Sequence, residues 1–172
     1  SILIILTSFL VAGDIKITCE EHLFNLYPKN RDIRMHIFQL DKQIKNKVEN
    51  IVKQRFYKDK LYYWTITQSD STKAYAFLDN VIGKSMPITF MVILNIDGEI
   101  ENVNVIKYRE AYGSEVGSKS WLQQFINFNN NSDYNIGKDI DGISGATISV
   151  KSISKGMKKI TTLYPLIQSQ LK

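Results

Sequence analysis

The sequence predicts an α+β fold, a single domain in which a largely antiparallel sheet is flanked by helices. Two segments, residues 40–56 and 147–164, carry apolar residues at helical spacing. Between them lie several short runs that are rich in aromatic and β-branched residues, as is typical of strands. No internal repeat or low-complexity linker interrupts the 172 residues, a length that suits one domain with a sizeable core.

The N-terminal stretch SILIILTSFLVAG, residues 1–13, is almost wholly apolar. A helix that crosses a bilayer needs about 20 apolar residues, so this stretch is too short to cross. Its length and its small residues Ala12 and Gly13 resemble the end of a signal peptide whose start is missing. We therefore expect an exported bacterial protein, periplasmic or on the outer face of the cytoplasmic membrane. A buried first strand is the alternative.

The rest of the chain divides into an N-terminal helical region, residues 14–60, and a second region, residues 61–172. The helix expected over 40–56 is followed by four expected strands, by a short helix that presents Trp121, Leu122, Phe125 and Ile126, and by a polar loop. Asp97-Gly98 predicts a tight hairpin between the last two strands. The expected strands, short helix and loop are 61–67, 74–79, 88–96, 100–108, 118–126 and 127–135.

The last helix is expected to begin between Thr147 and Ser149 and to stop near Pro165. Its apolar stripe and its lysines lie on different faces, so we expect the lysines to be solvated. The stripe is Val150, Ile153, Met157, Ile160 and Tyr164, and the lysines are Lys151, Lys155, Lys158 and Lys159.

Composition and charge exclude several classes of protein. The 22 Lys and Arg residues exceed the 17 Asp and Glu residues by five, but this surplus is not gathered into one block, so no nucleic-acid partner is expected. The single cysteine, Cys19, excludes an internal disulfide and a cysteine-rich metal or iron–sulfur site. His22 and His36 lie outside every motif, so we expect no metal site and no catalytic triad.

Small and hydroxyl-bearing residues gather just before the last helix, in DGISGATISVKSI, residues 141–153. A helix N-terminus has unpaired backbone N–H groups and a partial positive charge. Glycines allow a ligand to approach the backbone closely, and hydroxyls add donors, so the stretch suits a phosphate. The alternative is that a Ser or Thr side chain only caps the helix.

The order of these residues resembles the flavinylation motif of the FMN-binding domain family. That family includes the covalent-flavin subunits of sodium-translocating NADH:quinone reductases and of Rnf-type complexes, and many small exported proteins. The resemblance implies that Thr147 carries FMN through a phosphoester, transferred from FAD by a flavin transferase. The matching positions are Asp141, Ser144, Gly145, Ala146, Thr147 and Ser149.

The resemblance extends over roughly residues 74–163. It places Glu110 and Gly113 in a loop that borders the flavin. Tyr112 and Trp121 offer flat surfaces for the ring, and packing in the core is the alternative for Trp121. The larger complex subunits carry Thr-Pro-Gly in this loop, whereas this chain has Ala111-Tyr112-Gly113, which favours the small stand-alone branch.

These features predict an electron-carrier flavoprotein with a membrane or envelope redox partner and with no catalytic residue of its own. The flavin would supply the redox chemistry, and the protein would position it. Two alternatives stay open: a small flavin-dependent reductase of a diffusible acceptor, and a flavin-free envelope interaction domain.

Overall fold

The computed structural model describes residues 2–27, 31–69 and 71–172, with side chains from residue 13 onward. Short 3₁₀ turns occur at Ser114–Gly117, Gln123–Phe125 and Gln168–Gln170. The helices and strands, in chain order, are α1 (Ile2–Leu26), β1 (Asp32–Gln39), α2 (Lys42–Val52), β2 (Lys60–Gln68), β3 (Ser71–Ile82), β4 (Pro87–Asn95), β5 (Ile100–Lys107), α3 (Lys119–Leu122) and α4 (Thr147–Ile167).

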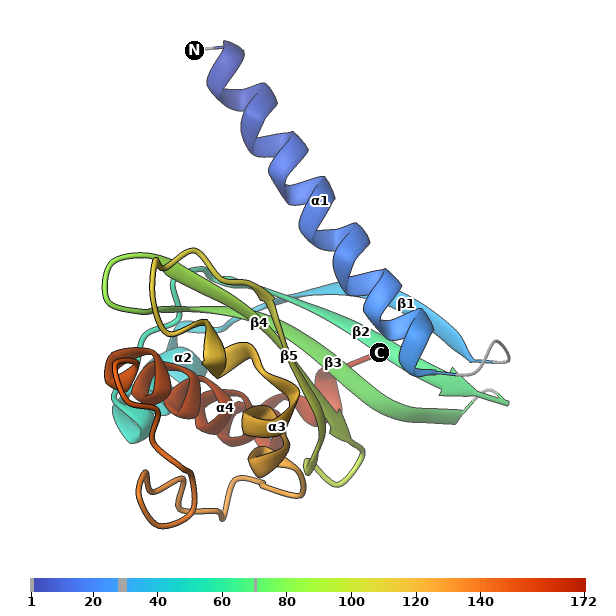
Figure 1. Cartoon of the computed structure of the whole chain (residues 1–172). Coiled ribbons are helices and arrows are strands. Elements are labelled where there is room, and N and C mark those ends of the chain that lie inside the picture. The colour runs from blue at the N-terminus through green and yellow to red at the C-terminus, as the bar shows by residue number, and fades with distance from the viewer. Residues whose placement is uncertain (1, 28–30, 70) are drawn as a thin grey trace.

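The five strands form one antiparallel sheet in the order β1-β2-β3-β4-β5, which confirms the predicted α+β class (Figure 1). Each strand therefore pairs with its neighbour in the sequence. The predicted hairpin between β4 and β5 is also confirmed. The side-chain oxygen of Asn95 accepts hydrogen bonds from the backbone N–H groups of Asp97 and Glu99, at 3.0 and 2.9 Å. Gly98 has a φ of 83°, which a glycine adopts without strain.

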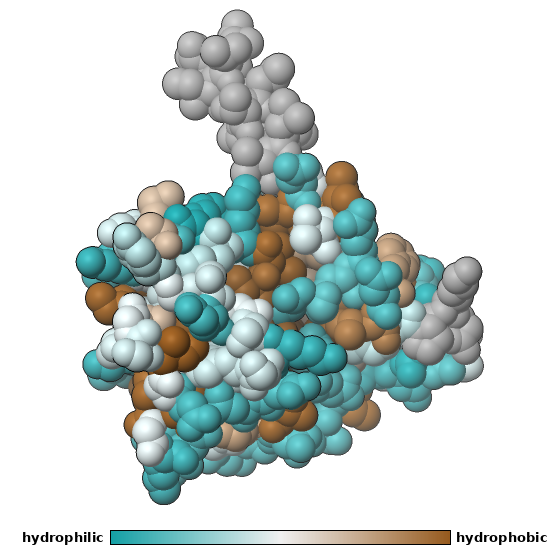
Figure 2. All heavy atoms as spheres, viewed as in Figure 1, coloured by the Kyte–Doolittle hydropathy of each residue, from teal (hydrophilic) through white to brown (hydrophobic). Residues whose placement is uncertain are grey.

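Helices cover both faces of the sheet. Successive side chains of a strand point to opposite faces, and in β4 Phe90 and Val92 join the core beneath α2, α3 and α4, whereas Met91 and Ile93 join a second cluster with α1. The small side chain of Ala76 lies in this second cluster, where α1 packs on the sheet. Figure 2 shows hydrophobic side chains gathered beside α1 on that face.

Helix α1 is continuous from Ile2 to Leu26, and its first half projects beyond the sheet (Figure 1). Cys19 and Leu23 on its second half are fully buried. The alternative of a buried first strand is therefore wrong, because these residues are helical. The side chains of the predicted signal segment lie outside the described residues up to Ala12, and its role stays a prediction. Over the residues that the structure describes, no helix has the length and hydropathy required to cross a membrane.

The predicted helical region, residues 14–60, contains the second half of α1 and all of α2, but it also contains an edge strand, β1, that the sequence pattern does not predict. The burial of the β1 side chains alternates along most of the strand. Ile33 and Met35 pack against the second cluster, which contains α1 residues, and Phe38 packs against the core beneath α2, α3 and α4. The polar residues Arg34 and His36 break up the apolar run. Its strand character comes from pairing with β2.

The two long helices predicted from the sequence both form, but their ends differ from the predicted ones. Helix α2 is shorter than the predicted 40–56, because the Asp41 side chain caps its start and Lys53 ends it in the left-handed conformation. Helix α4 passes the expected stop at Pro165 and ends at Ile167. A proline in the last turn removes only one backbone hydrogen bond, and continuing the helix buries Ile167 fully.

His22 connects α1 to β5 through both ring nitrogens. Its Nδ1 lies 2.9 Å from the Asn104 side-chain nitrogen, and its Nε2 lies 3.4 Å from the Asn102 side-chain oxygen. The first contact requires an unprotonated Nδ1, because the amide nitrogen is a donor. Burial lowers the pKa of His22 below its ordinary value of 6.5. The neutral form is therefore the one that holds α1 to the sheet.

We expect the stability contributed by His22 to be lost under acidic conditions. The pKa is lower in the folded chain than in the unfolded chain, so this stability is fully present above pH 6.5 and falls as the pH drops below it. Melting temperatures at about pH 7.5 and about pH 5.5, on either side of the ordinary histidine pKa, measure the loss. His22→Gln should show a smaller loss than the parent chain. An equal loss in both would assign the pH dependence to other groups, such as His36.

Candidate functional site

The candidate site is built around the first turn of α4. Ala146 occupies the N-cap position with φ −120° and ψ 22°, and no side chain caps the helix among the described residues. The alternative that a Ser or Thr side chain serves as the cap is therefore wrong. Thr147, the first helical residue, is exposed. The helix start thus presents a hydroxyl beside backbone N–H groups that no side chain has taken up.

The turn before the helix leaves this position open. Gly145 has a φ of 78°, and a Cβ built on it would have no atom within 4 Å. Its neighbour Ser144 is exposed, whereas Ala146 is buried and donates its N–H to the carbonyl of Ile143 at 3.1 Å. The glycine supplies the positive φ that turns the chain into α4. Thr147 and Ser144 are therefore both accessible on either side of this turn.

Tyr108, which follows β5, ties the predicted flavin loop to the helix start. Its hydroxyl donates to the Tyr112 carbonyl at 2.5 Å and lies 3.2 Å from the hydroxyl of Ser149. Ser149 is buried, so its hydroxyl faces Tyr108 on the protein side of the helix. Sequence reasoning missed Tyr108, because a tyrosine at the end of a β-rich run is equally typical of a core residue. The loop also brings Gly113 against Ala146.

We expect Gly113→Val to disturb this loop. Gly113 has a φ of 82°, and a Cβ there would lie 2.8 Å from the Cβ of Ala146, so the loop must move away from the helix. The absorbance or redox potential of bound flavin should then shift, while attachment at Thr147 is largely retained. Gly137→Val is the matched control, because Gly137 has a similar φ of 87° but open space around it. Unchanged spectra in a folded Gly113→Val protein would remove the loop from the flavin site.

Glu110 braces the turn between β3 and β4. Its carboxylate accepts hydrogen bonds from the backbone N–H groups of Ser85 and Met86, at 2.7 and 2.9 Å, and these bonds lower its pKa. Gly83 makes room for it, since a Cβ at that position would lie 2.5 Å from the carboxylate. Glu110 thus stabilises the backbone of the turn between β3 and β4. Tyr112, by contrast, is 85% exposed and offers a free ring face.

Trp121 and Gln124 hold the segment that leads into the motif. The Trp121 indole N–H donates to the Asp141 carbonyl at 2.8 Å, and the Gln124 side-chain oxygen accepts from the Asp141 N–H at 2.7 Å. The Trp121 ring is 6% exposed and packs edge-on against Phe125. Trp121 therefore positions the motif by holding the Asp141 backbone. The Asp141 side chain is exposed near the motif.

The structure brings Thr147, Ser144 and Gly113 into one neighbourhood at the start of α4. An exposed hydroxyl beside free helix N–H groups and a positive-φ turn suits a phosphate-bearing cofactor. Within the described ranges, no cluster of three His, Cys, Asp or Glu side chains is arranged to hold a metal ion. The geometry therefore favours one class of protein, an α+β domain that binds a phosphate-bearing cofactor.

The comparison with known families specifies that class. Residues 83–162 match the family model described as FMN-binding domain. The match spans β4, β5, the Tyr108 to Gly113 loop, α3 and most of α4. This segment is therefore similar to an FMN-binding domain, which supports a flavin-binding role for it. No curated protein matches the sequence.

Proposed function

We propose that this protein carries FMN through a phosphoester to Thr147 and passes electrons at the bacterial cell envelope. The observation that carries the proposal is the exposed hydroxyl of Thr147 at a helix start without a side-chain cap. Bound FMN would supply the capacity to accept and release electrons.

The residues around Thr147 have distinct parts in this proposal. The N–H groups of the first turn of α4 would bind phosphate oxygens, and the helix dipole would favour the negative charge by about 0.3–1 kcal/mol. Ser144, exposed on the preceding turn, would add a donor. Tyr108 would hold the loop at Tyr112 against the start of α4. The exposed face of Tyr112 would contact the flavin ring.

Attachment requires a second protein, a flavin transferase, because an unactivated threonine hydroxyl reacts too slowly with FAD. The Thr147 oxygen would form a bond to the phosphorus of the FMN half, the bond from that phosphorus to AMP would break, and AMP and the hydroxyl proton would be released. Export is supported by the apolar segment at residues 1–13.

The test is the mass of the intact protein. Protein produced with a flavin transferase and FAD should gain one FMN less one water, and protein produced without the transferase should not. An unmodified chain in the presence of an active transferase would contradict covalent attachment. Fractionation of the native host then tests export, since a cytoplasmic protein that retains residues 2–10 would contradict it.

A reductase of a diffusible acceptor is the second candidate. The exposed Tyr112 ring would leave the flavin accessible to small molecules. Turnover with a soluble donor and acceptor, in the absence of any membrane partner, would favour this candidate over an electron carrier.

A further inference from the structure

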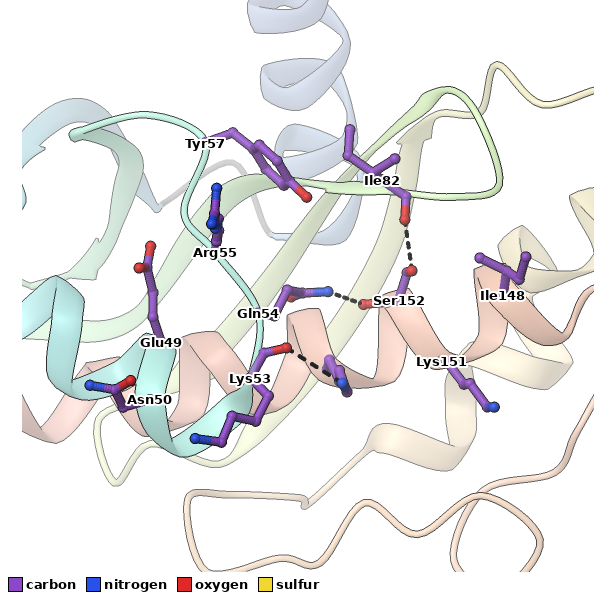
Figure 3. Close-up of a pocket in the computed structure, with 11 residues that line it drawn as sticks. Glu49, Asn50, Lys53, Gln54, Arg55, Tyr57, Ile82, Ile148, Lys151 and Ser152 are labelled. Atoms are coloured by element: carbon purple, nitrogen blue, oxygen red, sulfur yellow. Dashed lines mark hydrogen bonds between the residues drawn. The ribbon is translucent and has the colours of Figure 1, made fainter.

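A groove runs between α2, the segment after it and the outer face of α4, beside the attachment residue. Its volume is about 550 Å³, and Ile148, the residue after Thr147, forms part of its wall (Figure 3). The groove therefore begins one residue from the proposed cofactor.

The lining of the groove is divided between apolar and cationic side chains. Tyr57 and Ile82 lie at the top of Figure 3, and Lys53 and Lys151 lie at the bottom. Tyr57, Ile82 and Ile148 are 52%, 38% and 48% exposed, so their apolar surface is accessible to a partner. The basic lining residues are Lys53, Arg55, Lys151 and Lys155.

The acidic member of the described lining is engaged with the backbone. Glu49 is partly buried, and its carboxylate accepts the backbone N–H of Phe56 at 2.7 Å. The four basic side chains thus exceed the one acidic side chain. One of the basic side chains, Lys155, also contacts backbone, since its ammonium donates to the Lys53 carbonyl at 3.4 Å.

Hydrogen bonds between its walls keep the groove in shape. The Gln54 side chain donates to the Ser152 carbonyl at 2.9 Å, and the Ser152 hydroxyl donates to the Ile82 carbonyl at 2.7 Å. Lys159, buried beneath, donates to the Arg55 carbonyl at 2.8 Å. A preformed surface loses little conformational entropy when it binds a partner.

We infer that this groove is the docking surface for an acidic, amphipathic segment of a redox partner protein. Carboxylates of the partner would meet Lys53, Lys151 and Lys155, and an apolar side chain between them would pack on Tyr57 and Ile148. Such a division of charge and apolar area matches the ordinary anatomy of protein interfaces. The biological purpose of the docking rests on the proposed function, because it would bring the partner to the flavin at Thr147.

The test uses flavin-free protein and labelled synthetic peptides, read by fluorescence anisotropy. The first peptide alternates paired Glu and Leu residues, the second has Ser in place of Leu, and the third has Lys in place of Glu. Only the first should bind well, and its affinity should fall between low salt and about 0.15 M salt. Because no flavin is present, the outcome is independent of attachment at Thr147.

Variants locate the binding. Lys151→Glu should weaken binding of the Glu–Leu peptide about fivefold or more, since one attraction becomes a repulsion, and Tyr57→Ser should weaken it as well. Lys73→Glu is the matched control, because Lys73 is exposed near the start of β3 whereas Ile82 ends that strand at the groove. Equal affinities of Lys151→Glu and Lys73→Glu would overturn the inference. So would an absence of peptide binding together with Lys151-dependent binding to phosphatidylglycerol–phosphatidylcholine vesicles, which would assign the groove to a membrane surface.

Discussion

Thr147→Ala is expected to abolish the mass increment of one FMN less one water, even when transferase and FAD are both supplied. The substitution removes the oxygen that would form the phosphoester. The fold should remain intact, because Ala146 is the N-cap and Thr147 is exposed, so no core contact or cap is lost. Intact-protein mass spectrometry measures the increment directly, and a melting curve verifies the fold.

Neighbouring substitutions separate attachment from recognition. Ser144→Ala should reduce the yield of modified protein without abolishing it, because the attachment oxygen remains. Asp141→Ala should slow modification if the exposed carboxylate guides the transferase. A Thr147→Ala protein that still gains the mass would place the attachment elsewhere and contradict the proposed role of Thr147.

Lys159→Met is expected to cause the largest loss of stability. Lys159 is 0% exposed, and its ammonium lies 2.8 Å from the Asp79 carboxylate and 4.6 Å from the centre of the Phe56 ring. Asp79 is only 8% exposed. Removing the Lys159 cation therefore leaves a buried carboxylate without its partner, which costs about 3–5 kcal/mol of stability. Urea denaturation gives the free energy of unfolding.

Two controls make this result specific. Asp79→Asn combined with Lys159→Met removes both charges and should recover much of the lost stability, because no buried charge is left unpaired. Lys155→Met changes the same residue type one turn earlier, where the side chain is exposed, and should stay within about 0.5 kcal/mol of the parent. A loss for Lys159→Met as small as that for Lys155→Met would mean that the ion pair contributes little.

The sequence by itself determined the strands β2 to β5, the hairpin at Asp97-Gly98 and the apolar stripe of α4. These elements follow local rules, since apolar periodicity reports which face of an element is buried and a turn pair reports its own conformation. The residue order around Thr147 also predicted an FMN-binding domain, which the match over residues 83–162 supports. The sequence pattern was sufficient for features whose conformation depends on neighbouring residues alone.

Other features required the tertiary structure. Lys159 was expected to be solvated together with Lys151 and Lys155, but it is buried because Asp79 on β3 and the Arg55 carbonyl meet it beneath α4. These partners lie 80 and 104 residues away in the sequence, so a local sequence pattern does not reveal them.

The same reason applies to the remaining surprises. Strand β1 exists because β2 pairs with it, and Tyr108 matters because Ser149 is brought to its hydroxyl. The sequence alone left open whether a hydroxyl caps α4, because Ser and Thr before a helix suit either a cap or a ligand. Only the folded backbone decided it, since the turn at Gly145 sets Ala146 at the cap and leaves Thr147 exposed. Distant segments position this turn, because Trp121 and Gln124 hold the Asp141 backbone and Gly113 lies against Ala146. Local periodicity does not encode such contacts.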